Sequence, residues 1–154
     1  MTIVVIGVGN ALRGDDGAGI AVAARVRARK PEGVDVRICR LEPSRLIDAL
    51  GGAEVAILID AVATGAAAGS IHRFDASDTP VPSRELRSST HALGIGESLE
   101  LARTLGRLPR RTIVFGVEGS EFATGTEMSR AVQAGVGQAA EAVLEEVALC
   151  TSAR

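Results

Sequence analysis

Hydrophobic and polar residues follow two patterns along this chain, and each pattern predicts one kind of secondary-structure element. Five short runs rich in apolar and β-branched residues are typical of strands, and the first is apolar almost throughout, as in a strand covered on both faces. The expected strands span residues 2–8, 34–39, 54–60, 70–74 and 111–117. Longer stretches with apolar residues at helical spacing predict helices, over residues 16–30, 44–50, 91–105 and 127–149.

This alternation of strands and helices predicts an α/β fold in a single domain over residues 1–154. We expect a doubly wound, mostly parallel sheet with helices on both faces. Only the loop 63–69 separates the strand at 70–74 from its predecessor, which favours an antiparallel placement for it. Ser44 is a candidate cap for the helix that begins there.

Composition narrows the classes of protein to which the chain can belong. Its 154 residues are 46% apolar, and 17 Lys and Arg against 19 Asp and Glu give a net charge of −2. This balance argues against nucleic-acid or anionic-membrane partners, and the lack of Trp and Tyr excludes base-stacking platforms. No apolar stretch is long enough to cross a membrane, and the N-terminus has no signal-peptide pattern. We therefore expect a cytoplasmic monomer.

The two cysteines, Cys39 and Cys150, lie far apart in the sequence and do not have the spacing of a zinc ribbon. Each has apolar neighbours, and we expect both to be small buried hydrophobic residues. His72 lies beside Arg73 in a short strand, which predicts a position on the surface.

Ligands of open α/β sheets bind beyond the carboxyl ends of the strands, so the residues at that edge decide the chemistry. The chain places there residues 7–17 after the first strand, 60–61 after the third, 116–119 after the fifth and 88–91 before a helix. The pair Gly7 and Gly9 resembles part of a dinucleotide fingerprint. However, Leu12 replaces its third glycine, and the acids Asp15 and Asp16 would repel a pyrophosphate.

Three side chains at this edge can converge on one crevice: Asp16, Asp60 and His91. An Asp that ends a buried run, as Asp60 does, is costly unless it is paired or solvated. Each residue also has a structural explanation. Asp16, like Asp15, can complement a helix N-terminus, Asp60 can cap the next loop, and His91 can begin a helix. Together, two carboxylates and one imidazole suit a divalent metal ion or acid–base chemistry without a metal.

These segments also resemble a known family. The string from Gly7 to Gly19 (GVGNALRGDDGAG) is similar to the opening motif of the hydrogenase maturation proteases, the C-terminal endopeptidases of nickel–iron hydrogenase large subunits. The resemblance continues in order through four later segments. These are IDA at 59–61, STHALG at 89–94, VFGVE at 114–118 and GTEMSRAV at 125–132. No G-x-S-x-G or H-E-x-x-H motif points to a serine hydrolase or a zincin instead.

The resemblance implies one α/β domain around a twisted five-stranded sheet, with Asp16, Asp60 and His91 as the metal-contacting and catalytic residues. It implies an endopeptidase that removes the C-terminal extension of a nickel-loaded large-subunit precursor. The nickel would come from the precursor, without a bound organic cofactor. Two alternatives stay open: a non-catalytic nickel-sensing maturation chaperone and, from the glycine pair alone, a nucleotide-binding domain.

Overall fold

A computed structural model describes residues 2–40, 42–82 and 94–152 of the chain. In these ranges the strands are β1 (Ile3–Val8), β2 (Val34–Cys39), β3 (Val55–Val62), β4 (Ile71–Asp75) and β5 (Arg111–Glu118). The helices are the short 3-10 helix η1 (Gly14–Gly17), α1 (Ala18–Ala28), α2 (Pro43–Leu50), α3 (Ile95–Thr104) and α4 (Arg130–Ser152). None of the helices seen in these ranges combines the length and the apolar character needed to span a bilayer.

The five strands form one sheet in the order β2-β1-β3-β5-β4. The pairs β1–β2, β1–β3 and β3–β5 are parallel. β4 pairs with β5 in the antiparallel direction, as its short connection to β3 predicts. The predicted α/β fold with a mostly parallel sheet is therefore confirmed.

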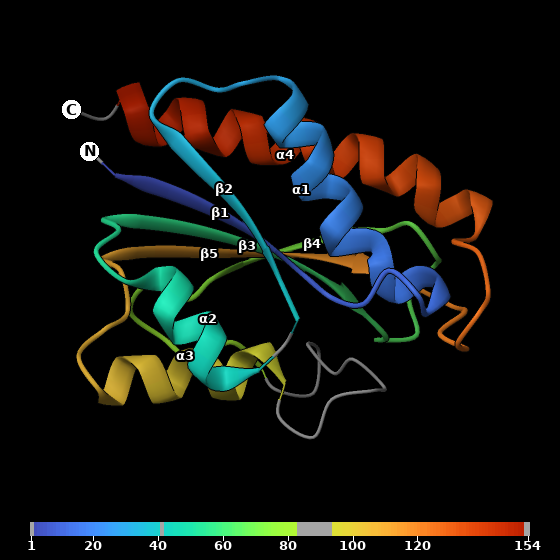
Figure 1. Cartoon of the computed structure of the whole chain (residues 1–154), viewed down its shortest axis with the longest axis horizontal. Coiled ribbons are helices and arrows are strands. Elements are labelled where there is room, and N and C mark those ends of the chain that lie inside the picture. The colour runs from blue at the N-terminus through green and yellow to red at the C-terminus, as the bar shows by residue number, and fades with distance from the viewer. Residues whose placement is uncertain (1, 41, 83–93, 153–154) are drawn as a thin grey trace.

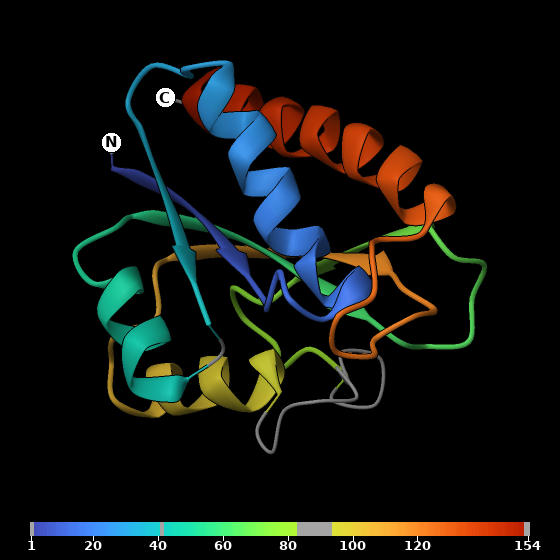
Figure 2. The same ribbon diagram turned by 45° about the vertical axis from the view of Figure 1, so that its right-hand side comes forward.

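Helices cover both faces of this sheet (Figure 1). The α1 and α4 helices lie on one face and the α2 and α3 helices on the other, and the turned view in Figure 2 shows the same three layers. Side chains of β3 alternate between two cores: Ile57 and Ile59 join the α1/α4 core, while Ala56 and Leu58 join the α2/α3 core. By the same alternation, the side chain of Asp60 lies on the α2/α3 face.

The glycines of the first motif serve the packing of α1 on the sheet. A Cβ atom added to Gly7 would lie 2.5 Å from the backbone oxygen of Gly19 and 2.6 Å from the Cβ of Ala23. Only a residue without a side chain allows α1 to approach β1 this closely. This packing role explains the glycine pattern without a dinucleotide.

Three predicted helix starts are wrong, and the error at α2 has a local cause. Ser44 does not cap α2, because the helix already begins at Pro43, and Glu42 precedes it in an extended conformation. Proline suits the first helical position and disfavours the helical conformation in the residue before it. The helix predicted from residue 16 starts at Ala18, after η1, and the last helix starts at Arg130, not at residue 127.

Candidate active site

Asp60 lies near the carboxyl end of β3 and is fully buried. Its Oδ1 accepts a hydrogen bond of 2.8 Å from the backbone N–H of Ala61. Its Oδ2 accepts no hydrogen bond from the part of the chain that the structure describes. A buried carboxyl group with one oxygen left open is costly to fold, which marks a position that serves something other than stability.

Asp16 approaches Asp60 from the loop after β1, and Gly9 makes this approach possible. Gly9 has a φ of 150°, and the backbone oxygen of Asp16 occupies the place where a side chain would be. The backbone N–H of Asn10 donates a hydrogen bond of 3.2 Å to the same oxygen. The loop therefore folds back on itself and holds Asp16, which is fully buried, in η1.

The two carboxyl groups interact electrostatically. Burial raises the pKa of Asp60 well above its ordinary value, and the negative charge of Asp16 raises it further, while the hydrogen bond from Ala61 acts in the opposite direction. Two acids at one buried centre disfavour simultaneous ionisation, so the pair tends to hold one proton. Such a pair can supply both a proton donor and a proton acceptor.

His91, the third member of the predicted set, lies outside the described residues. The structure thus brings together two of the three side chains, Asp16 and Asp60. Across the ranges that are described, no three His, Cys, Asp or Glu side chains are grouped so that they could hold a metal ion. The predicted metal contact through Asp16, Asp60 and His91 stays a prediction.

A pocket of about 510 Å³ opens between the loop after β1 and the end of β2. Leu12 and Ile38 line it and are 66% and 40% exposed, which is unusual for large apolar side chains. Cys39 also lines the pocket. It is half-buried, whereas the sequence predicts a buried residue. Burial raises the pKa of the Cys39 thiol, and Asp60 raises it further, while Arg45 acts in the opposite direction.

Asp15, next in sequence to Asp16, has a different role. Its carboxylate accepts backbone hydrogen bonds of 2.8–2.9 Å from Ser120, Glu121 and Ser129. Burial raises the pKa of Asp15, but these hydrogen bonds outweigh it and hold the pKa below its ordinary value. The expected structural role is right, but the expected partner is wrong. Asp15 ties the loop after β5 to η1 and does not complement the first turn of α1, which contains no acid.

Sequence reasoning missed a second polar group at this edge, formed by Glu118, His72 and Thr64. Glu118 ends β5 and is only 1% exposed. It accepts hydrogen bonds from the backbone and the hydroxyl of Thr64 and lies 3.1 Å from Nε2 of His72. The predicted surface position of His72 is only partly right, because its side chain is 25% exposed and bonded to a buried acid.

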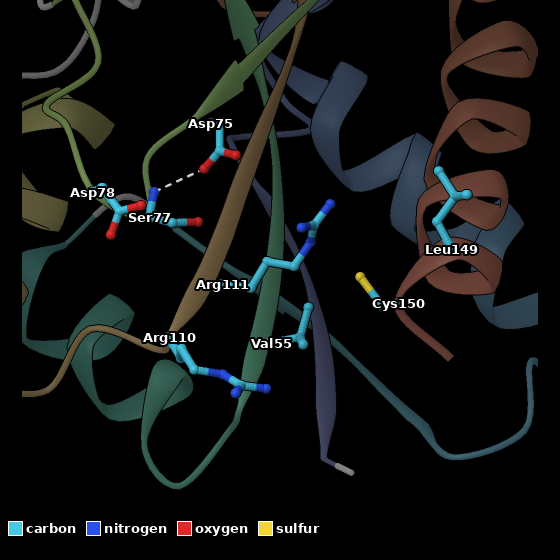
Figure 3. A pocket seen from close by; sticks show the side chains of 8 residues that line it. All are labelled: Val55, Asp75, Ser77, Asp78, Arg110, Arg111, Leu149 and Cys150. Carbon is cyan, nitrogen blue, oxygen red and sulfur yellow. Dashed lines mark hydrogen bonds between the residues drawn. The ribbon is translucent and has the colours of Figure 1, made fainter. Parts of the chain in front are cut away.

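The opposite, amino-terminal edge of the sheet also has a pocket, of about 400 Å³ (Figure 3). There Arg111 from β5 and Cys150 from α4 point toward each other. Cys150 is buried, as the sequence predicts. Asp75 and Asp78 line this pocket together with Arg110 and Arg111, and Glu146 of α4 is bonded to Arg73 and Arg111. Because Asp75 and Asp78 are exposed and two arginines line the pocket with them, this pocket is a weaker candidate for acid–base chemistry than the buried centre around Asp60.

The fold and the acidic pair are consistent with one class of protein, the maturation proteases of hydrogenases. The model of the hydrogenase maturation protease family HycI matches residues 28–146, and the chain therefore belongs to this family. The matched range includes Asp60 and His91 and begins after Asp16.

Curated relatives carry related names. The chain is 28% identical over 122 residues to the hydrogenase expression/formation protein HupD of Thiocapsa roseopersicina, covering 78% of this chain and 55% of HupD. It is 30% identical over 122 residues to HoxM of Azotobacter vinelandii, with 78% and 59% covered. The chain thus spans a little over half the length of the curated relatives that it matches.

Solved structures share the fold. The hydrogenase maturating endopeptidase HybD of E. coli superimposes with a TM-score of 0.81 over 97% of this chain and 94% of HybD, at 21% identity. A hydrogenase 2 maturation peptidase from Thaumarchaeota archaeon SCGC_AB-539-E09 gives a TM-score of 0.70 at 27% identity, with 96% and 98% covered.

Proposed function

We propose that this protein is an endopeptidase that removes a C-terminal extension from the large-subunit precursor of a [NiFe] hydrogenase. The observation that carries the proposal is the pair of buried carboxyl groups, Asp16 and Asp60, at the carboxyl edge of the sheet. Membership of the hydrogenase maturation protease family supports the reaction, and the endopeptidase and peptidase names of the solved relatives support its class.

We further propose that Asp16, Asp60 and His91 contact nickel that the precursor carries. Two carboxylate oxygens and one imidazole nitrogen suit a borderline divalent ion and leave positions open for the precursor's own ligands. Three protein ligands do not complete the coordination shell of the ion, which allows the protein to release the matured subunit. Nickel is then part of the substrate and serves to fix the bond that is cut.

Two mechanisms fit this arrangement. In the first, the substrate's nickel polarises the scissile carbonyl or activates a water molecule, and Asp16 or Asp60 accepts the proton. In the second, the two carboxyl groups act as an aspartic-type pair, and nickel serves only for recognition. The raised pKa of Asp60 favours Asp60 as the member of the pair that holds the proton.

Intact mass spectrometry of a nickel-loaded large-subunit precursor tests the proposal. The unaltered protein should remove a defined C-terminal peptide, and Asp60→Asn should slow this removal by about a thousandfold, because it deletes one acid of the pair. Asp48→Asn is the matched control, since Asp48 is 77% exposed on α2 and should leave the rate unchanged.

The same assay separates the alternatives. Unchanged cleavage by Asp60→Asn would overturn the assignment of the pair. If the unaltered protein binds the precursor but leaves it full-length, the result would favour a nickel-sensing chaperone. Cleavage of a metal-free precursor would support the aspartic-type mechanism, whereas strict dependence on nickel is compatible with both mechanisms.

A further inference from the structure

The group formed by Glu118, His72 and Thr64 is built around a buried carboxylate. Oε2 of Glu118 accepts a hydrogen bond of 2.8 Å from the backbone N–H of Thr64. Oε1 accepts one from the Thr64 hydroxyl and lies 3.1 Å from Nε2 of His72. The ring of His72 also stacks on Phe74, with centroids 6.3 Å apart. The imidazole is thus held at one nitrogen and along one face.

These contacts determine which nitrogen of His72 carries the proton. The backbone N–H of Thr64 can only donate. The Thr64 hydroxyl oxygen accepts from the backbone N–H of Ala66 at 3.3 Å, so its own proton is directed to Glu118. An ionised Glu118 accepts at both oxygens, and Nε2 of His72 then donates to it. In the neutral ring, Nδ1 is left as a hydrogen-bond acceptor.

His72 lies in one row with Asp60 across the sheet. Asp60 is in register with Gly116 on β5, and Gly116 is in register with His72 on β4, so all three lie on the same face. Because β4 is antiparallel, its first residues reach the carboxyl edge of the parallel strands (Figure 1). Two strand spacings place the backbones of Asp60 and His72 about 10 Å apart.

The surroundings of His72 favour a ligand that donates hydrogen bonds. His72 lines a pocket of about 400 Å³ together with Thr64, Arg73 and Phe74. The guanidinium of Arg73 is bonded to Glu146 of α4, which covers the other face of the sheet. With that cation engaged elsewhere and Glu118 beneath the ring, the pocket suits an N–H donor better than an acidic group.

We propose that His72 is a substrate-binding residue whose Nδ1 accepts a hydrogen bond from an N–H group of the precursor polypeptide. This inference rests on the proposed function, because it assumes that the reacting bond lies at Asp60. An extended chain advances about 3.3 Å per residue, so the donor lies about three residues from that bond. Glu118 positions the imidazole, and it does not itself touch the substrate.

Two substitutions separate substrate binding from a purely structural role. His72→Gln places an amide N–H near the position of Nε2, which keeps the contact with Glu118 but removes the acceptor at Nδ1. His72→Asn places an amide oxygen near Nδ1, which keeps the acceptor but removes the contact with Glu118. If His72 only held Glu118 and the loop at Thr64, His72→Asn would be the more damaging change.

The experiment measures kcat and KM for cleavage of the nickel-loaded precursor by the three proteins. We expect His72→Gln to raise KM about tenfold with kcat unchanged and His72→Asn to raise it less than about threefold, as for loss of one hydrogen bond formed with the substrate. An unchanged KM for His72→Gln, or a larger loss for His72→Asn, would overturn the inference.

The inference can be tested even if the proposed function fails. If the unaltered protein binds the precursor without cutting it, the dissociation constant replaces KM, and the same order of the two variants is expected. Equal affinity of His72→Gln and the unaltered protein would then overturn the binding role of His72. Absence of binding by the unaltered protein would overturn it as well, together with the proposed function.

Discussion

The two ends of the sheet bury acidic side chains in opposite ways. Near the amino-terminal edge, Glu146 of α4 is 3% exposed and bonded to two cations, Arg73 at 2.8 Å and Arg111 at 3.5 Å. At the carboxyl edge, Asp60 is fully buried, no Lys or Arg of the described residues forms an ion pair with it, and its electrostatic neighbour is another acid, Asp16. One end pairs its buried acid with cations, and the other places two buried acids beside each other.

This difference makes the carboxyl edge the better candidate for the site of chemistry. A buried acid with matched cations stabilises or is neutral, whereas two adjacent buried acids cost stability. A fold retains such a costly pair where it serves a reaction or a ligand. The pocket volumes alone, about 400 Å³ at the amino-terminal edge and about 510 Å³ at the carboxyl edge, would not have distinguished the two ends.

The largest expected effect on stability comes from removing the cations around Glu146. The double substitution Arg73→Met and Arg111→Met leaves a buried carboxylate without a partner and should lower the free energy of unfolding by about 3 kcal/mol. Adding Glu146→Met should restore most of this loss, because an apolar replacement of the whole group removes the buried charge. Urea denaturation at pH 7 measures both. A triple variant as unstable as the double would show that packing, not charge, dominates at this end.

A smaller loss is expected at Asp15, whose carboxylate is fully hydrogen-bonded. Asp15→Ala leaves the N–H groups of Ser120, Glu121 and Ser129 without their acceptor and should cost about 2 kcal/mol at pH 7. Folding lowers the pKa of Asp15 below its ordinary value of 3.8. The carboxylate therefore contributes fully to the free energy of unfolding above pH 3.8, and this contribution declines as the pH falls through the folded pKa. The difference from the unaltered protein in urea denaturation should therefore shrink in strong acid. Asp35→Ala, on the exposed face of β2, is the control that should change little.

The sequence predicts the strands well because their apolar runs are continuous, and it finds Asp60 because an acid ends such a run. Glu118 ends the run of β5 in the same way, so the same reasoning applied there would have found it. Its partner His72 is 46 residues away on the edge strand, and no local pattern links the two. The contacts of Asp15 span more than 100 residues, which is why its position beside a helix start pointed to the wrong partner.

The last expected effect is a gain in stability from Asp60→Asn, the reverse of the loss at Asp15. Folding raises the pKa of Asp60, so the protonated acid is compatible with the fold at low pH. As the pH rises above 3.8, ionisation increasingly favours the unfolded chain until the folded pKa is passed. Asparagine resembles the protonated acid in shape and does not ionise. The variant should therefore match the unaltered protein near pH 4 and exceed its free energy of unfolding at pH 7, by a difference that grows as the pH rises between these values.

Urea denaturation of both proteins between pH 4 and pH 7 gives this difference directly, and the exposed Asp48→Asn should follow the unaltered protein at every pH. An Asp60→Asn variant that is less stable at pH 7 would mean that Asp60 is ionised and stabilised in the folded protein. The carboxyl edge would then balance its charge as the other end does, and the contrast between the two ends would disappear. A gain in stability combined with loss of cleavage would instead show that the fold gives up stability at Asp60 in exchange for activity.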